Sequence, residues 1–188
     1  MAFHVKARLP WMPPVPPLSY FAQVNIRTYV KGPQSVAGLW FLSLDANSVG
    51  AALGGRLIYR VPFHWSQTTM DSSPGLVEYS TQRRGDQTVG TKLSVEILEP
   101  DPIKNLDSLS RFLTARHFLF AGSSEKVVQA SATHPAWTLH RARVRSIEEG
   151  LMSAAGLSKP DNPDLAHWSP GVVARISRPS TTGSHSIT

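Results

Sequence analysis

The sequence contains no cysteine among its 188 residues. Disulfide bonds, thiolate nucleophiles and thiolate metal ligands are therefore excluded. No stretch reaches the roughly 20 consecutive apolar residues that a membrane-spanning helix needs. The N-terminus also lacks the basic region, apolar stretch and small-residue cleavage site of a secretory signal. These absences predict a cytoplasmic protein with no membrane association.

Dense clusters of positive charge are missing as well, although the formal net charge is +6. Binding to a phosphate backbone requires Lys and Arg side chains close together, because each neutralised phosphate adds affinity. The densest groups are Arg83-Arg84 and the alternating Arg141, Arg143 and Arg145, without interleaved aromatic residues. We therefore expect a solvated basic surface and no nucleic-acid partner.

The usual signatures of catalysis and cofactor binding are also absent. The seven histidines show neither His-x-His nor His-Glu-x-x-His spacing, so no metal site is predicted. Ser43, His64 and Asp45 supply the residue types of a hydrolase triad, but the Gly-x-Ser-x-Gly elbow is missing. The glycines at 50, 54 and 55 do not form a phosphate-binding loop, and no cofactor is predicted.

What the chain does contain suits a single packed domain. Hydrophobic residues make up 41% and charged residues 17% of the sequence, as in ordinary globular proteins. A chain of this length buries enough surface for one core. We expect one domain over residues 1–178, followed by a disordered polar tail over 179–188 because that segment lacks core-forming residues.

Alternating apolar and polar residues predict many short strands. Five prolines between residues 10 and 17 predict a stiff connector. Short helices are expected over 47–58, from Asp107 onwards and over 148–155. Many strands with few helices favour a mainly β fold, a closed or strongly curved antiparallel sheet. The expected strands cover residues 3–9, 21–30, 36–45, 64–70, 75–83, 88–98, 118–120, 126–132 and 137–147.

Two neighbouring strands carry the candidate site residues. On the first, every second residue is polar and shares one face: Gln23, Asn25, Arg27 and Tyr29. Arg27 could hold a carboxylate ligand in a bidentate pair, or it could lie on the outer face or pair with Asp45. Asp45 ends the second, buried strand and needs a partner there, which capping of the helix that begins near residue 47 would supply.

The order of these segments resembles a known family, the YqjF-like bacterial proteins of unknown function. The resemblance extends from about Phe3 to Ile176, and that family is related to acetoacetate decarboxylase. It therefore implies a β-barrel or cone around a small, largely apolar cavity. The segments that carry the resemblance are residues 25–30, 40–46, 56–62, 112–114, 134–139 and 154–157.

The resemblance does not extend to the decarboxylase chemistry. In the decarboxylase, a lysine forms a Schiff base and a second lysine lowers its pKa, since only a neutral amine attacks a carbonyl. The corresponding segment here, residues 59–64, contains no lysine. Gln23 also stands where relatives carry glutamate, and an amide cannot act as a general base. We therefore do not expect Schiff-base decarboxylation.

The resemblance also implies further N-terminal strands, because relatives usually carry several tens of residues before the segment that matches Phe3. Two explanations stay open: Met1 is not the true start, or this copy is truncated. An unpaired strand edge would then remain open. This predicts poor solubility or self-association into a homo-oligomer.

The sequence thus favours binding of a small organic ligand, of carboxylate type, in an apolar cavity. Arg27 would anchor the anion. The resemblance implies that His64 lies near the position of the decarboxylase lysines, so it is the expected cavity histidine and could act as an acid or base. Two alternatives stay open: a lyase or hydrolase without a Schiff base that acts on a small keto or carboxylic acid, and a degenerate copy with no function. The expected ligand-binding residues are Gln23, Asn25, Arg27, Tyr29, Ser43, Asp45, Tyr59 and His64.

Overall fold

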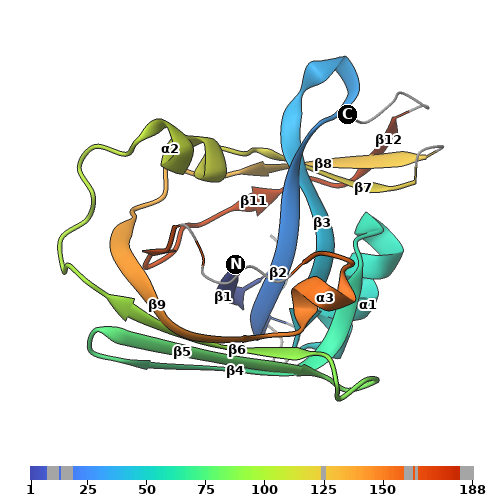
Figure 1. Cartoon of the computed structure of the whole chain (residues 1–188). Coiled ribbons are helices and arrows are strands. Elements are labelled where there is room, and N and C mark those ends of the chain that lie inside the picture. The colour runs from blue at the N-terminus through green and yellow to red at the C-terminus, as the bar shows by residue number, and fades with distance from the viewer. Residues whose placement is uncertain (8–12, 14–18, 124–125, 159–162, 164, 183–188) are drawn as a thin grey trace.

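The computed structural model describes residues 1–7, 13, 19–123, 126–158, 163 and 165–182, which form a strongly bent sheet with short flanking helices (Figure 1). The helices are α1 (Val49–Gly54), α2 (Ser108–Thr114) and α3 (Leu151–Ala154), with a 3-10 turn η1 (Pro33–Ser35) and a π-helical turn η2 (Gly55–Tyr59). The strands are β1 (Ala2–Lys6), β2 (Tyr20–Lys31), β3 (Ala37–Ala46), β4 (Phe63–Ser73), β5 (Leu76–Arg83), β6 (Gly90–Ile97), β7 (Phe118–Gly122), β8 (Val127–Thr133), β9 (His140–Glu149), β10 (His167–Trp168), β11 (Arg175–Ile176) and β12 (Ser180–Thr182).

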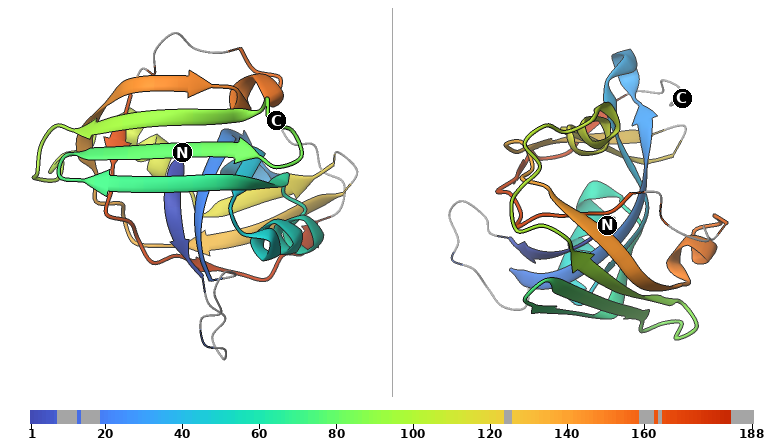
Figure 2. Two further views of the ribbon diagram at one scale, coloured as in Figure 1. Left: turned by 90° about the horizontal axis from the view of Figure 1, so that it is seen from below. Right: turned by 60° about the vertical axis from the view of Figure 1, so that its left-hand side comes forward.

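Strand β3 joins the two halves of the sheet. One edge of β3 pairs along its length with β2, which in turn pairs with β1. The other edge pairs with β7 at Leu39 and Trp40, and with β4 from Leu44 to Ala46. From there one half continues through β4, β5, β6, β9 and β10, and the other through β7, β8 and β11. The two halves therefore leave the same edge of β3 at different points along it and diverge from there (Figures 1 and 2).

A β-bulge in β3 lies between these two pairing regions. Ile26 of β2 is opposite Ser43, but the next residue, Arg27, is opposite Phe41. Leu42 therefore has no partner on β2, and a bulge of this kind bends its strand and increases the local twist.

The main hydrophobic core lies where α1 and η2 pack against the sheet. Its members are Phe21, Leu44, Ala46, Ala52, Val61, Phe63, Leu119, Ala121 and Ala130. Ser48 caps α1 by accepting a hydrogen bond from the Ala51 amide at 3.2 Å. Gly55 permits the close approach of η2, because a Cβ there would overlap the Phe63 ring.

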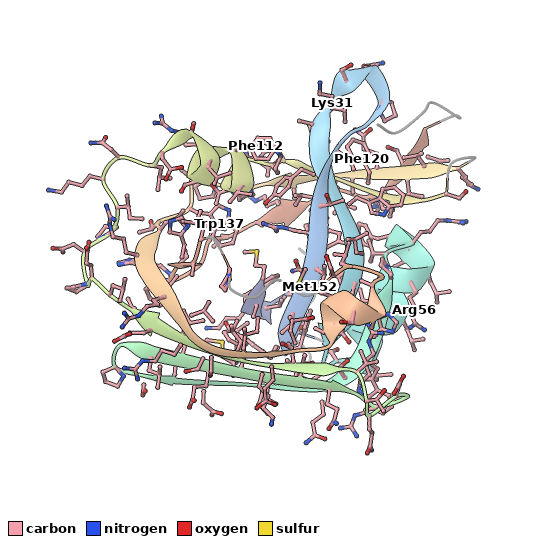
Figure 3. The ribbon with its side chains drawn as sticks, in the orientation of Figure 1. Lys31, Arg56, Phe112, Phe120, Trp137 and Met152 are labelled. Carbon is pink, nitrogen blue, oxygen red and sulfur yellow. The ribbon has the colours of Figure 1, made fainter. Side chains whose placement is uncertain are left out.

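A second tightly packed point fixes the turn between β2 and β3. The Phe120 side chain is fully buried, and its ring lies against Gly32 and Gly38 at the two ends of that turn. A Cβ at either glycine would overlap the ring. The turn is therefore held against β7 by this aromatic side chain, which Figure 3 labels beside Lys31.

The predicted mainly β fold with a few short helices is confirmed, but the sheet differs from the expected antiparallel barrel in two ways. β3 pairs in parallel with both β4 and β7, because each partner is reached through a long crossover rather than a tight turn. Within the described residues the strand order ends at β10 and β11, so the sheet curves without closing. None of the helices in this part of the chain is long and apolar enough to cross a membrane.

The sequence predicted two irregular segments, the C-terminal tail and the proline-rich connector. Disorder was expected from residue 179, but β12 pairs with β8 from Ser180 to Thr182, so that part of the predicted tail is ordered. Residues 183–188 lie outside the described residues, as do all but Pro13 of the proline-rich connector over 10–17.

Candidate functional site

The predicted site residues are divided between two faces of the β2–β3 pair. Gln23 and Asn25 lie opposite Ala46 and Leu44, and therefore face the main hydrophobic core. Both are buried, and the Asn25 Oδ1 atom has no hydrogen-bond partner among the described residues. Ser43 and Asp45 alternate with those core residues and point to the other side of the sheet. The structure therefore does not bring these two pairs together.

The other residues predicted on β2 and η2 have different neighbours. Arg27 is near the α-amino group of Met1, whose pKa falls to about 5, chiefly because the group is buried and secondarily because of the Arg27 charge. The Tyr29 hydroxyl donates to the Leu113 carbonyl at 3.1 Å, beside α2. The Tyr59 hydroxyl donates instead to the Ser177 carbonyl at 3.2 Å, in the C-terminal segment.

Asp45 is the centre of a buried polar cluster. Its carboxylate accepts hydrogen bonds from Arg83 Nε at 2.9 Å, Ser66 Oγ at 2.9 Å and Ser43 Oγ at 2.6 Å. Arg83 reaches this carboxylate because β5 pairs with β4 so that Arg83 lies opposite Ser66. The Asp45 side chain is completely buried and that of Arg83 is 13% exposed.

The expectation that Asp45 needs a partner is confirmed, but the expected partner was wrong. Ser48 caps α1 and Arg83 neutralises Asp45, so Asp45 neither caps the helix nor pairs with Arg27. The cause is tertiary, because Arg83 is 38 residues away in the sequence and comes close only through the β4–β5 pairing.

The Asp45 cluster does not form a hydrolase triad. Ser43 Oγ donates to Asp45 and accepts from Arg83 Nη2 at 2.8 Å, so its proton is directed at the carboxylate. A triad requires the histidine between the hydroxyl and the carboxylate. With its oxygens occupied by Arg83, Ser43 and Ser66, the carboxylate serves to join β3, β4 and β5.

His64 lies next to this cluster on the parallel strand β4, paired with Asp45 in register. Burial lowers the pKa of the half-buried imidazole, the Arg83 and Arg56 charges lower it further, and only Asp45 acts to raise it. His64 is therefore largely neutral at pH 7, as a group that accepts a proton must be.

The lowered pKa of His64 predicts how stability depends on pH. The unfolded chain, with a histidine pKa near 6.5, binds the proton more tightly than the folded chain. Stability should therefore fall as pH falls through about 6.5 and level off below the folded-state pKa. In His64→Gln, denaturant unfolding between pH 7 and 5 should show a smaller loss of stability than in the parent chain.

A variant of His167 is the control for this test, because burial also lowers the pKa of the His167 imidazole. His167→Gln should remove a separate part of the same pH dependence and leave the His64 resonance unchanged. An NMR titration that places His64 at or above its ordinary pKa would contradict this account of its surroundings.

A pocket lies at the other end of β2, around Tyr29. It has a volume of about 410 Å³ and is bounded by the end of β2, the start of β3 and α2 (Figure 3). The Tyr29 and Phe112 ring centroids are 5.0 Å apart, and the Arg116 guanidinium lies 4.0 Å from the Phe112 centroid. We call this the Tyr29 pocket; its lining residues are Tyr29, Val30, Lys31, Ala37, Phe112 and Arg116.

The Tyr29 pocket has two cations and no acidic partner for them. Within the described residues, no carboxylate lies within ion-pair distance of Lys31 or Arg116. In the described part of the chain, the Arg116 side chain makes one hydrogen bond, from Nη1 to the Ala115 carbonyl at 2.9 Å. Most of its guanidinium donors therefore remain available to an anion.

Neighbouring histidines support the main chain at Arg116. The rings of His117 and His134 lie 4.8 Å apart, and His134 Nε2 is 3.3 Å from the Arg116 carbonyl oxygen. In the part of the chain that the structure describes, no three His, Asp or Glu side chains are grouped so that they could bind a metal ion. The histidine pair thus packs beside the Tyr29 pocket and supports Arg116.

The sequence identified Tyr29 but missed Lys31, Phe112 and Arg116 as its neighbours. One signal was available, since Lys31 continues the face that Arg27 and Tyr29 share on β2. Nothing in the sequence indicated that the predicted helix after Asp107 lies beside Tyr29, because Tyr29 and its partner Leu113 are 84 residues apart.

Comparisons with known proteins agree with this fold. A family model described as "Uncharacterized conserved protein", DUF2071, matches residues 2–173. The uncharacterized protein YqjF of Bacillus subtilis is 26% identical over 168 residues, which cover 89% of this chain and 68% of that protein. The crystal structure of acetoacetate decarboxylase from Legionella pneumophila superposes with a TM-score of 0.62 at 10% identity, covering 89% of this chain and 68% of that one. At this identity the likeness to the decarboxylase concerns the fold alone. The predicted resemblance to the YqjF-like family and the predicted relation to the decarboxylase fold are both confirmed.

Proposed function

Because the chain belongs to the DUF2071 family of uncharacterized conserved proteins, we propose a function from its geometry: it binds a small organic carboxylate with an aromatic or apolar body in the Tyr29 pocket. The observation that carries this proposal is the pairing of two cations that have no acidic partner with two aromatic rings around one hollow. This moves the predicted carboxylate site from Arg27 towards the end of β2.

The chemistry of the lining residues supports a carboxylate. A guanidinium offers a planar fork of donors that matches the two oxygens of a carboxylate, and the ammonium of Lys31 adds a second positive charge. Tyr29 and Phe112 offer ring faces and edges for an apolar ligand body. A volume of about 410 Å³ lies within the range of small-molecule pockets.

Arg27 is a secondary contributor in this proposal. It precedes Tyr29 by two residues on β2 and therefore shares its face, but it does not line the pocket. Its charge adds positive potential to the same face of β2 without a direct hydrogen bond to the ligand. In this proposal the ligand does not contact the other predicted site residues, which are Gln23, Asn25, Ser43, Asp45, Tyr59 and His64.

The proposal is tested by titration with benzoate, and with benzyl alcohol as the uncharged analogue. Arg116→Met keeps a long side chain over Phe112 but removes the charged donors, so benzoate affinity should fall roughly tenfold or more. Benzyl alcohol binding should change little. Calorimetry or NMR titration measures both affinities.

Matched variants separate the pocket from general charge effects. Arg111→Met removes a cation from α2 outside the lining and should leave benzoate binding unchanged, while Arg27→Ala should weaken it less than Arg116→Met does. Benzoate binding that survives both Arg116→Met and Lys31→Met would refute the proposed site.

A further inference from the structure

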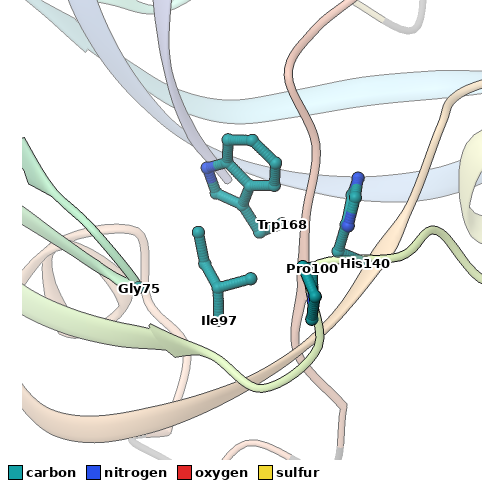
Figure 4. Close-up of a pocket in the computed structure, with 5 residues that line it drawn as sticks. All are labelled: Gly75, Ile97, Pro100, His140 and Trp168. Carbon is teal, nitrogen blue, oxygen red and sulfur yellow. The ribbon is translucent and has the colours of Figure 1, made fainter.

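A second pocket lies at the opposite side of the sheet from α1, where β6, β9 and β10 meet. It has a volume of about 320 Å³, and Figure 4 labels its five lining residues. We call it the His140 pocket; its lining residues are Gly75, Ile97, Pro100, His140 and Trp168. It shares no residue with the Tyr29 pocket.

Strand pairing directs these side chains to one place. Trp168 of β10 is the direct cross-strand partner of His140 at the start of β9, so both point to the same face. Ile97 at the end of β6 is opposite Ala142, which shares a face with His140 two residues earlier. The Ile97 amide donates to the Gly75 carbonyl at 2.8 Å, and this bond fixes the β4–β5 turn as the remaining wall.

The imidazole of His140 carries an unused hydrogen-bonding atom in this apolar setting. The residue is 8% exposed, and its Nδ1 atom is buried with no partner in the described part of the chain. The Trp168 ring lies edge-on to the imidazole, with centroids 5.1 Å apart. A buried polar atom without a partner is unfavourable, and the great majority of such atoms in folded proteins are satisfied. A ligand that enters the pocket can supply the missing hydrogen bond.

We propose that the His140 pocket is a second binding site, which takes a small neutral organic molecule with an apolar body and one hydroxyl or carbonyl group bonded to His140 Nδ1. Neutrality follows from the lining, which has no acidic side chain and no lysine or arginine. The apolar body packs against Trp168, Ile97 and Pro100. This site is independent of the carboxylate proposed for the Tyr29 pocket.

The probe for this site is cyclohexanol, with cyclohexane as the control that lacks the polar group. In the intact chain with ¹⁵N-labelled histidine, cyclohexanol should cause a saturable shift of the His140 Nδ1 resonance, and cyclohexane should not. His140→Phe keeps an aromatic ring but removes the nitrogen, so cyclohexanol affinity should fall about threefold to tenfold while cyclohexane affinity is retained.

A second variant keeps the test independent of any effect of His140→Phe on folding. Ile97→Trp fills the pocket and should abolish binding of both probes, while benzoate binding at the Tyr29 pocket stays as in the parent chain. The proposal is overturned if His140 Nδ1 shows no shift at cyclohexanol concentrations up to its solubility. It is equally overturned if a crystal soaked with cyclohexanol holds only water at that atom.

Discussion

Arg83→Met should lower the free energy of unfolding by about 3–5 kcal/mol, because it leaves the carboxylate of Asp45 buried without its partner. The cost comes from the uncompensated charge rather than from the lost attraction alone. Ser43 and Ser66 would still donate to Asp45, but neutral hydroxyl groups cannot balance a full negative charge. Chemical denaturation of the variant and the parent chain measures the difference.

A double variant distinguishes this explanation from a simple loss of packing. Asp45→Leu combined with Arg83→Met removes both charges, so most of the lost stability should return. A surface pair provides the opposite control: Lys92 and Glu148 are largely exposed, and Lys92→Met should cost less than about 1 kcal/mol. If the double variant is no more stable than Arg83→Met alone, the buried charge is not the cause.

Phe120→Ala should also be strongly destabilising, by about 3–5 kcal/mol, because it empties a fully buried aromatic position. Little can collapse into the space, since the ring faces Gly32 and Gly38, which have no side chains to move. These glycines directly follow Lys31 and Ala37 of the Tyr29 pocket. The variant should therefore lose benzoate affinity as well as stability.

Phe112→Ala is the matched aromatic control for this prediction. Its side chain is 48% exposed, so the loss of stability should be much smaller than for Phe120→Ala, while benzoate affinity should still fall because a ring of the pocket is gone. Denaturation and titration of both variants provide the comparison. A Phe120→Ala protein as stable as Phe112→Ala would show that the turn between β2 and β3 is not held by the buried ring.

Local patterns in the sequence were sufficient to locate most strands and helices. Period-two alternation placed β2, and a nearly continuous apolar run placed β3, each to within one residue of its observed ends. The polar residues at 47 and 48 correctly marked the start of α1. Asp107 was also correctly placed before α2, where its side chain accepts the Ser110 amide at 2.8 Å. These signals are local, so one sequence contains them.

Pairing between distant strands could not be predicted in the same way. Parallel pairing of β3 with β7 joins Leu39 to Leu119, and no local pattern encodes that choice. The candidate site was therefore the hardest part to predict, because Arg83, Phe112 and Arg116 reach their positions only when distant segments of the chain come together. The sequence thus identified Asp45 and Tyr29 as notable residues but not the groups that surround them.

The shared edge of β3 has a consequence for synthesis of the chain on the ribosome. The part of this edge from Leu44 to Ala46 gains its partner early, because only α1 and η2 separate β3 from β4 in the sequence. The first half, at Leu39 and Trp40, waits for the residues around 119 and 120. At 5–20 residues per second, roughly 80 residues take about 4–16 s. During that interval the growing chain carries an open strand edge of the kind that chaperones bind and that drives aggregation.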